Sequence, residues 1–248
     1  MGALDGKRAI VTGASSGIGA STARALAREG ALVAAGARRL DRLNELGEGI
    51  VTLELDVTDA ESAASFVASA VHRLERLDIL VNNAGLALGR DLFDESNEDE
   101  EEAVLETNVH GLIRMTRLCL PHLQEGGHIV NIGSVAGRQA YERGALYVTS
   151  KFAARGFTYA LREDLLGRPI RLTTVDPGLV ETNFSRVRYR GDEAAAAKVY
   201  EGVEPLSPDD IAECVLFTLT RPPHVNVDEL VVKALAQSSG ARILRQEA

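Results

Sequence analysis

The stretch Thr12-Gly13-Ala14-Ser15-Ser16-Gly17-Ile18-Gly19 decides the fold of this chain. It follows the short apolar run Arg8 to Val11 and precedes an Ala-rich segment that ends at Gly30, an order that predicts a strand, a glycine loop and a helix. The three glycines let the backbone turn tightly and approach a pyrophosphate, which the amide N–H groups of a helix N-terminus can bind. The stretch therefore predicts a dinucleotide site, although an ordinary glycine-containing turn can have the same composition.

Apolar runs alternate with helical patterns along the rest of the chain. We expect strands at residues 8–11, 31–36, 50–55, 78–82, 128–132, 170–175 and 229–233. Most of these runs are continuously apolar, which is typical of a parallel sheet that is covered on both faces. Ser207-Pro208 is a favourable start for a helix that continues through Leu219, and the acidic run from Asp94 to Glu102 is expected to begin another helix. We predict a single α/β domain over residues 1–248, built on a Rossmann-type doubly wound parallel sheet of about seven strands.

Composition excludes several classes of protein. A chain of 248 residues with 45% hydrophobic content can bury a full core. No stretch approaches the ~20 apolar residues that a membrane span requires, so we expect a soluble, cytoplasmic protein without a membrane partner. The net charge of -9 argues against nucleic-acid binding. The five His residues show no ligand spacing, and Cys119 and Cys214 lie far apart in apolar helical contexts, so neither a metal site nor a disulfide is expected.

Chemistry is indicated by Ser134, Tyr147 and Lys151. If residues 146–166 form a helix, the phenol and the ammonium lie one turn apart on the same face. A free phenol has a pKa of about 10, so it acts poorly near neutral pH unless a cation such as Lys151 favours the phenolate. The Ser134 hydroxyl, at the end of the preceding strand, can donate to a carbonyl oxygen. Alone the pair is a weak indication, because both residue types are common on exposed helix faces.

Several motifs in this order resemble the classical short-chain dehydrogenase/reductase family over nearly the whole chain. They are the Gly-x-x-x-Gly-x-Gly loop, Asn82-Asn83-Ala84-Gly85, Asn108, Ser134, Tyr147-x-x-x-Lys151 and Pro177-Gly178. Residues 82–89 and 184–192 are most similar to the family's branch of NADP-dependent 3-hydroxy acid and serine dehydrogenases. The resemblance implies an NADP-dependent oxidoreductase that interconverts an alcohol and a carbonyl, with Asn108, Ser134, Tyr147 and Lys151 as catalytic residues. It also implies a homo-oligomer, commonly a tetramer.

In the implied mechanism the nicotinamide carries the hydride, since no side chain can donate one. By resemblance, Tyr147 exchanges the proton, Ser134 holds the substrate oxygen, and Lys151 lowers the pKa of Tyr147 and holds the nicotinamide ribose. Asn108 orders a water that links Lys151 to solvent.

The end of the second expected strand predicts the choice of cofactor. A carboxylate there favours NAD, whereas arginine favours the 2'-phosphate of NADP, and this chain has Ala37-Arg38-Arg39. Both arginines could also simply solvate the strand end. Asp56 is expected either to contact the adenine or to cap a helix. The residues predicted to bind NADP(H) are Gly13, Ser15, Ser16, Gly17, Ile18, Gly19, Arg38, Arg39, Asp56, Val57, Asn83, Ala84, Gly85, Tyr147, Lys151, Pro177, Gly178 and Thr182.

The substrate is expected to meet Ser134, Tyr147 and a flap at about residues 183–206. Arg186, Arg188 and Arg190 in that segment could clamp a carboxylate, or could form a solvated loop face. Arg188 matches an arginine of the 3-hydroxy acid branch, so it is the first candidate, with serine or 3-hydroxypropionate as substrate.

Two alternatives remain open at this stage. Arg138 and Arg143 flank the approach to Tyr147 and could reshape the pocket for a bulkier aldehyde or ketone, as in reductases of clavulanate-type aldehydes. A protein that senses NADP without chemistry is the other alternative, although the full set of catalytic residues argues against it.

Overall fold

The computed structural model describes residues 2–246 and contains one parallel sheet with the strand order β3-β2-β1-β4-β5-β6-β7. The order reverses between β1 and β4, and the loops that diverge there leave a crevice at the carboxyl ends of the strands. The strands are β1 (Arg8–Thr12), β2 (Leu32–Ala37), β3 (Ile50–Glu54), β4 (Leu77–Asn82), β5 (Leu123–Ile132), β6 (Arg171–Pro177) and β7 (Glu229–Val232). The predicted doubly wound, seven-stranded fold is confirmed.

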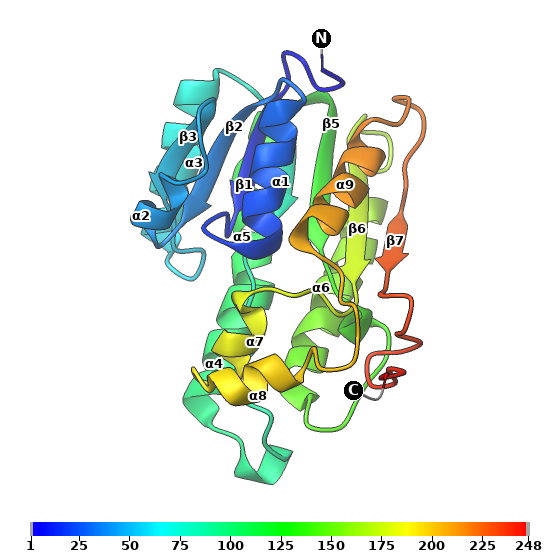
Figure 1. Ribbon diagram of the computed structural model, residues 1–248. Helices are drawn as coiled ribbons and strands as arrows, with labels where there is room; N and C mark the ends of the chain where they lie inside the picture. The colour runs from blue at the N-terminus through cyan, green and yellow to red at the C-terminus, as the bar shows by residue number, and fades with distance from the viewer. Residues whose placement is uncertain (1, 247–248) are drawn as a thin grey trace.

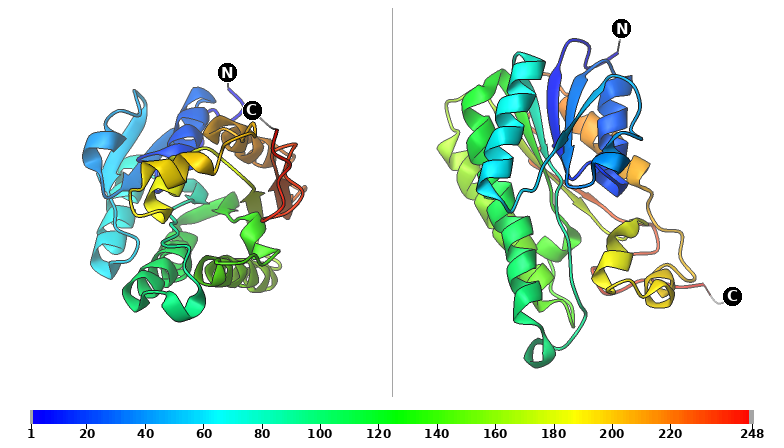
Figure 2. Two further views of the ribbon diagram at one scale, coloured as in Figure 1. Left: turned by 60° about the horizontal axis from the view of Figure 1, so that its bottom comes forward. Right: turned by 90° about the vertical axis from the view of Figure 1, so that its left-hand side faces the viewer.

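Helices cover both faces of the sheet (Figures 1 and 2). The α-helices are α1 (Gly17–Arg28), α2 (Leu40–Leu43), α3 (Ala60–Leu74), α4 (Glu98–Leu105), α5 (Leu112–Cys119), α6 (Ala145–Asp164), α7 (Asn183–Arg188), α8 (Glu193–Lys198) and α9 (Pro208–Leu219). Short 3-10 turns lie at Phe93–Glu95, Leu120–His122 and Val135–Gly137, and a π-helical segment, Glu106–Gly111, joins α4 to α5.

Two hydrophobic cores form because neighbouring side chains of a strand point to opposite faces. In β1, Val11 packs with α1 and α9, for example with Leu26 and Ile211. Its neighbour Ile10 faces the other core, which α3 and α5 fill with side chains such as Phe66 and Met115. The segment that carries α7 and α8 lies beyond the carboxyl ends of the strands, in the lower part of Figure 1.

Helix starts follow the capping residues of the sequence. Ser207 and Asp210 form a capping box at α9, with Pro208 in the first turn, as predicted. The acidic run begins α4 as expected, but only from Glu98, because Asn97 caps the helix by accepting from the amides of Asp99 and Glu100. Asp94 and Glu95 belong to the preceding 3-10 turn.

One strand boundary was also wrong. β5 begins at Leu123, whereas the sequence predicted a start at 128, because the exposed residues Gln124 to Gly126 lack the apolar character of a buried strand. They belong to the sheet through the pairing of Leu123 with Leu77, after which the register shifts.

Candidate active site and cofactor cleft

A long cleft of about 470 Å³ runs along the carboxyl ends of the strands, from the glycine loop to Tyr147. Seventeen of the eighteen residues predicted to bind the cofactor line this cleft, all except Gly19. A Cβ at Gly19 would lie 2.5 Å from the Gly13 carbonyl oxygen and 2.4 Å from the Asn83 side chain. Gly19 therefore lets α1 pack closely against the loop instead of lining the cleft. The sequence analysis missed further lining residues, among them Phe184 and Val187 of α7.

The Asn82 to Gly85 motif fixes the conformation of the glycine loop through hydrogen bonds and close packing. Gly13 and Gly17 have φ of +66° and +55°, which favours glycine, and a Cβ at Gly13 would lie 2.7 Å from the Ala84 Cα. The Asn83 side chain donates to the carbonyl of Thr12 at 2.9 Å and to that of Gly13 at 3.1 Å. The Thr12 hydroxyl accepts from the backbone amides of Asn83 and Ala84, both at 3.0 Å.

These contacts leave the N-terminus of α1 facing the cleft. Ser16 is its N-cap residue, but its side chain accepts no capping hydrogen bond from the helix. The first-turn amides and the positive end of the helix dipole are therefore suited to bind a phosphate.

Two arginines lie at the other end of the cleft, where β2 ends. Arg38 and Arg39 both line it, and Arg39 donates to the hydroxyls of Ser15 at 3.0 Å and Ser16 at 3.1 Å. Ala37, the residue before them, is buried and offers no carboxylate. The arrangement provides cations and hydroxyls at this end, which suit a phosphate better than a ribose hydroxyl.

Asp56 lies opposite Arg38 at the end of β3. Partial burial acts to raise its pKa, but hydrogen bonds from Thr58, aided by the charges of Arg38 and Arg114, hold the pKa below its usual value. Asp56 accepts from the amide and hydroxyl of Thr58. The N-cap of α3 is Asp59, so the alternative role of Asp56 as a helix cap was wrong.

At the opposite end, α6 presents Tyr147 and Lys151 one turn apart beside Ser134. Ser134 begins the turn after β5, where its hydroxyl accepts from the Ala136 amide at 3.0 Å. Lys151 is buried, and its ammonium donates to the Ile132 carbonyl at 3.0 Å and lies 5.8 Å from the centroid of the Tyr147 ring. Phe184 packs against the same ring, with centroids 5.4 Å apart and an interplanar angle of 60°.

The electrostatics of this group differ from the expectation in one respect. Burial raises the pKa of Tyr147, whereas its hydrogen bond with Ser134 and the charge of Arg188 oppose the rise. Burial also lowers the pKa of Lys151 to about 8, against the opposing charge of Asp176. The sequence analysis named only Lys151 as the favourable charge, whereas in the structure the charge of Arg188 acts on the phenol as well. Lys151 lies over the ring face and donates to the backbone.

Asn108 lies behind the cleft, in the π-helical segment between α4 and α5. Its amide oxygen accepts from the Leu86 amide at 2.8 Å, and its nitrogen donates to the Leu86 carbonyl at 2.8 Å and to the Ser150 hydroxyl at 2.9 Å. Such π segments inside helices often occur at functional sites. Here Asn108 fixes the loop that follows the Asn82 motif against α6.

Only one of the three candidate flap arginines faces Tyr147. Arg186 pairs with Glu193 at 2.6 Å, and Arg190 pairs with Asp91 at 2.5 Å and with Glu100 at 2.7 Å. Arg188 instead lies 5.5 Å from the centroid of the Tyr147 ring.

Arg188 is held there by Tyr141, a residue that the sequence analysis missed. The guanidinium donates to the Tyr141 hydroxyl at 3.0 Å and lies over that ring as well, 5.4 Å from its centroid. Its buried Nε has no hydrogen-bond partner among the described residues. Arg188 and Tyr147 also border a small cavity of about 20 Å³ that is separate from the long cleft.

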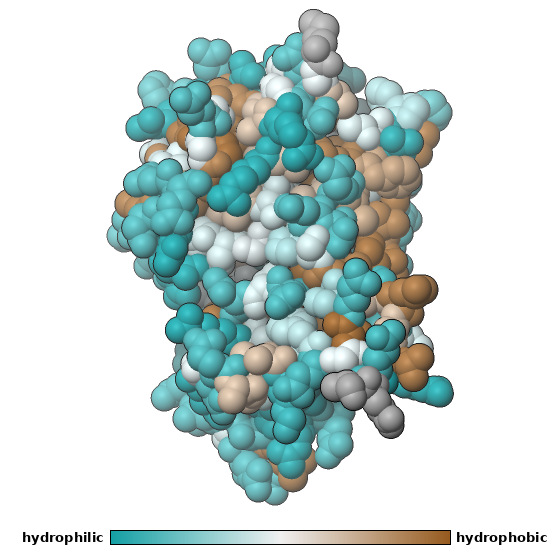
Figure 3. Space-filling model, in the orientation of Figure 1, coloured by the Kyte–Doolittle hydropathy of each residue, from teal (hydrophilic) through white to brown (hydrophobic). Residues whose placement is uncertain are grey.

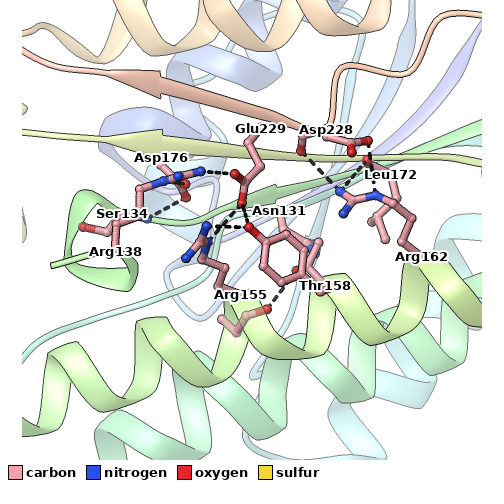
Figure 4. A network of polar contacts seen from close by, with 12 residues as sticks. Asn131, Ser134, Arg138, Arg155, Thr158, Arg162, Leu172, Asp176, Asp228 and Glu229 are labelled. Atoms are coloured by element: carbon pink, nitrogen blue, oxygen red, sulfur yellow. Dashed lines mark hydrogen bonds and ion pairs between the residues drawn. The ribbon is translucent and has the colours of Figure 1, made fainter.

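The expectation that both Arg138 and Arg143 shape the substrate pocket was wrong for Arg138. Its guanidinium pairs with Asp176 at 2.7 Å and with Glu229 at 2.5 Å (Figure 4), and Arg138 lines neither the long cleft nor the small cavity. These carboxylates come from β6 and β7, which the sequence could not place beside residue 138. Arg143 does border the small cavity, at a backbone φ of +59°.

Other expectations concern absences. Within residues 2–246, no helix is both long and apolar enough to cross a bilayer, and no cluster of metal-ligating side chains occurs. Cys119 is buried and Cys214 partly buried, and both are free thiols.

A doubly wound sheet with a glycine loop at its switch point, and a Ser, Tyr and Lys group beside it, defines a Rossmann-fold oxidoreductase. The family model described as short chain dehydrogenase matches residues 7–193. This chain belongs to the short-chain dehydrogenase family, as its motifs predicted.

Relatives of this family are similar over their full length. The NADP-dependent 3-hydroxy acid dehydrogenase of Schizosaccharomyces pombe is 40% identical over 259 residues, which cover 100% of both chains. Serine 3-dehydrogenase of Agrobacterium fabrum is 36% identical, with 96% of this chain and 98% of that protein covered. A closed form of serine dehydrogenase complexed with NADP+ matches with a TM-score of 0.91 and 38% identity, over 97% of this chain and 100% of that one.

Proposed function

We propose that this protein is an NADP(H)-dependent oxidoreductase that interconverts a small 3-hydroxy acid and the corresponding carbonyl compound. The observation that carries the proposal is the position of Arg188. Its partly buried guanidinium lies over the Tyr147 ring, and its Nε has no hydrogen-bond partner within residues 2–246. The relatives named NADP-dependent 3-hydroxy acid dehydrogenase and serine 3-dehydrogenase support it.

The cleft fits an NADP molecule in shape and in charge. Gly13 and Gly17 let the loop approach Ala84 and Thr182 closely, and the N-terminus of α1 beside them has no side-chain cap. Arg38, Arg39 and the hydroxyl of Ser15 would bind the 2'-phosphate at the far end. When bound, the nicotinamide supplies or accepts the hydride.

The residues of the chain would then handle the proton and the substrate. Tyr147 would accept the hydroxyl proton as phenolate during oxidation and would donate it during reduction. Ser134 would hold the substrate oxygen beside the phenol, since both residues line the same end of the cleft and Ser134 acts to lower the pKa of Tyr147. Lys151 would contact the nicotinamide ribose and transfer protons through a water ordered near Asn108.

Arg188 would bind the substrate carboxylate through bidentate hydrogen bonds from its guanidinium. Tyr141 keeps the guanidinium over Tyr147, so the carboxylate would be bound close to the reacting carbon. A short substrate such as serine or 3-hydroxypropionate would place its carboxylate at Arg188 while its hydroxyl lies beside Tyr147. Arg138 pairs with Asp176 and does not border the small cavity beside them. The alternative substrate, a bulkier aldehyde or ketone, is therefore supported by only one of the two residues on which it was based.

The test is NADPH formation with serine, 3-hydroxypropionate and 3-hydroxyisobutyrate, beside NADPH consumption with neutral aldehydes and ketones. We expect turnover of the hydroxy acids and a loss of at least about tenfold in kcat/KM in Arg188→Ala, the size of one lost charge-assisted contact. Arg186→Ala is the matched control, because Arg186 lies on the same helix but pairs with Glu193. Turnover of neutral carbonyls alone would discard the hydroxy acid and keep the reaction class.

We also propose that the protein forms a homo-oligomer, by family resemblance a tetramer. Hydrophobic surface gathers on the side of the molecule where β7 and the C-terminal segment lie (Figure 3). Phe217, Val231, Leu235 and Leu244 are exposed, and β7 is an edge strand. An exposed apolar edge of this kind favours association, which light scattering would measure.

A further inference from the structure

Behind Ser134 lies a group of charged side chains that the proposed mechanism does not use, shown in Figure 4. We call Arg138, Asp176, Glu229, Arg155 and Tyr159 the Arg138 network. Arg138 joins Asp176 of β6 at 2.7 Å to Glu229 of β7 at 2.5 Å. On its other side, Glu229 accepts from Arg155 at 3.0 Å and from Tyr159 at 2.6 Å, both on α6. Glu229 thereby holds Arg138 in place.

Asp176 brings this network into contact with the active site. Its side chain is only 2% exposed, and one carboxylate oxygen accepts from the Ser134 backbone amide at 3.2 Å. A Cβ at residue 133 would lie 1.9 Å from the same oxygen, so Gly133 is what allows the carboxylate to approach. A negative charge is thus buried directly behind the serine that would hold the substrate oxygen.

A buried carboxylate needs a partner, because an uncompensated charge in the interior is strongly unfavourable. Burial raises the pKa of Asp176, and the hydrogen bond and charge of Arg138 lower it, with Lys151 as a further favourable charge from α6. Glu229 opposes ionisation from β7. Arg138 is the cation that contacts Asp176 directly, since Lys151 donates its hydrogen bond to Ile132 instead.

The charge of Asp176 also acts on the proposed proton-transfer groups. It raises the pKa of Tyr147 and opposes the effect of burial on Lys151. Arg188, from α7, acts on Tyr147 in the opposite direction. The pKa of Tyr147 therefore depends on how far Arg138 neutralises the charge of Asp176.

We propose that Arg138 is a positioning residue that neutralises Asp176, and thereby sets the pH range in which Tyr147 works and fixes the backbone at Ser134. The inference rests on the proposed role of Tyr147 in proton transfer. It does not depend on which alcohol or carbonyl is the substrate.

The first experiment compares pH profiles of kcat/KM for oxidation in wild type, Arg138→Gln and Arg138→Lys. Oxidation needs the phenolate, so the rate rises with pH as Tyr147 ionises. In Arg138→Gln the unneutralised Asp176 should move this rise upward by about one pH unit, a typical effect of one nearby charge. At a fixed pH below the rise, kcat/KM should fall about tenfold. Arg138→Lys keeps the charge and should stay close to the wild-type profile.

A second background tests whether the effect passes through Asp176. Asp176→Asn keeps an oxygen for the Ser134 amide but removes the charge, so it should move the rise to lower pH. In that background, Arg138→Gln should cause no further shift, and an equal shift in both backgrounds would overturn the proposal. An unchanged profile in Arg138→Gln would overturn it as well. If Arg138→Gln does not fold, the pH profile of Asp176→Asn tests the proposal by itself. A profile identical to that of wild type would then contradict it.

Arg162→Gln is the matched control. Arg162 lies on α6 and pairs with Asp228 at 3.2 Å (Figure 4). It lies 5.7 Å from the centroid of the Tyr159 ring, but no ion pair joins it to Asp176 or Glu229. It should leave the pH profile in place, and a shift equal to that of Arg138→Gln would refute a specific role.

A readout without turnover separates this inference from the proposed function. The tyrosinate absorbance of wild type minus that of Tyr147→Phe reports the ionisation of Tyr147 directly. If no substrate were turned over, the proposed function would fail, but the same difference measured with and without Arg138→Gln would still test the network.

Discussion

Removing a single arginine at the end of β2 should weaken the binding of NADPH and leave NADH almost unaffected. The two changes are Arg38→Ala and Arg39→Ala, and Arg42→Ala is the control. Arg38 and Arg39 line the cleft, whereas Arg42, three residues further on, pairs with Asp41 and Glu45 outside it. All three arginines are exposed, so the loss of packing should be similar in the three variants.

The size of the effect follows from the contacts of each side chain. A charge-assisted hydrogen bond contributes about 1.5–3 kcal/mol, which corresponds to roughly 10- to 150-fold in Kd. Both guanidinium groups are exposed and therefore screened, so we expect the lower end, about tenfold for each. Part of the charge of Arg38 already acts on Asp56, whereas Arg39 contacts only hydroxyls here, so Arg39→Ala should have the larger effect.

The assay is equilibrium titration of the purified protein with NADPH and with NADH, followed by cofactor fluorescence at two salt concentrations. The NADPH affinity of wild type should fall as salt rises, and this dependence should decrease in each variant. Arg38→Asp should go further, because a carboxylate repels the 2'-phosphate and can accept from a ribose hydroxyl. Equal losses for both cofactors, or an Arg42→Ala loss as large as that of Arg39→Ala, would refute the assignment of these arginines to the 2'-phosphate.

Three further changes test the site and the core. Tyr147→Phe should keep NADPH affinity but lose turnover by at least about 100-fold, the usual size of an acid–base contribution, and turnover near wild type would remove Tyr147 from the proton step. Burial lowers the pKa of His128 to about 3. Between about pH 6.5 and 3, His128 is therefore protonated in the unfolded chain but neutral in the folded chain. The free energy of unfolding should therefore fall by up to about 1.4 kcal/mol per pH unit between about pH 6.5 and 3, with a shallower fall in His128→Gln when both are measured by urea unfolding. Gly36→Ala should destabilise by about 1–3 kcal/mol, because its Cβ would lie 2.5 Å from the Phe66 ring, and Gly36→Ala with Phe66→Leu should recover part of the loss; a Tm equal to that of wild type would contradict this packing.

Local motifs explain why so much of the cofactor cleft could be predicted from the sequence. The glycine loop and the Tyr147 and Lys151 spacing are defined within one turn or one helix, so their geometry depends little on distant segments. The sheet was equally accessible, because strands buried on both faces are continuous apolar runs. The exception was the exposed start of β5, which has no such pattern.

The substrate end could not be predicted in the same way, because its arginines are sorted by partners far away in the sequence. Arg190 is held by Glu100, ninety residues earlier, and Arg188 by Tyr141, forty-seven residues earlier. Arg138 likewise turns to a carboxylate of β6 instead of the pocket. Nothing in the spacing of three neighbouring arginines indicates which will be neutralised by such pairs and which will face Tyr147.

Charge distribution connects the two ends of the site. The chain has a net charge of -9, yet the proposed cofactor and the proposed substrate are both anions. Attraction must therefore come from local cations, among them Arg38 and Arg39 at one end and Lys151 and Arg188 at the other. Arg188 acts on the Tyr147 phenol as well, so a substrate carboxylate that neutralises Arg188 would also remove part of the charge that favours the phenolate. Neutralisation of Asp176 by Arg138 would then matter most once substrate is bound, and the shift in Arg138→Gln should be larger for kcat than for kcat/KM.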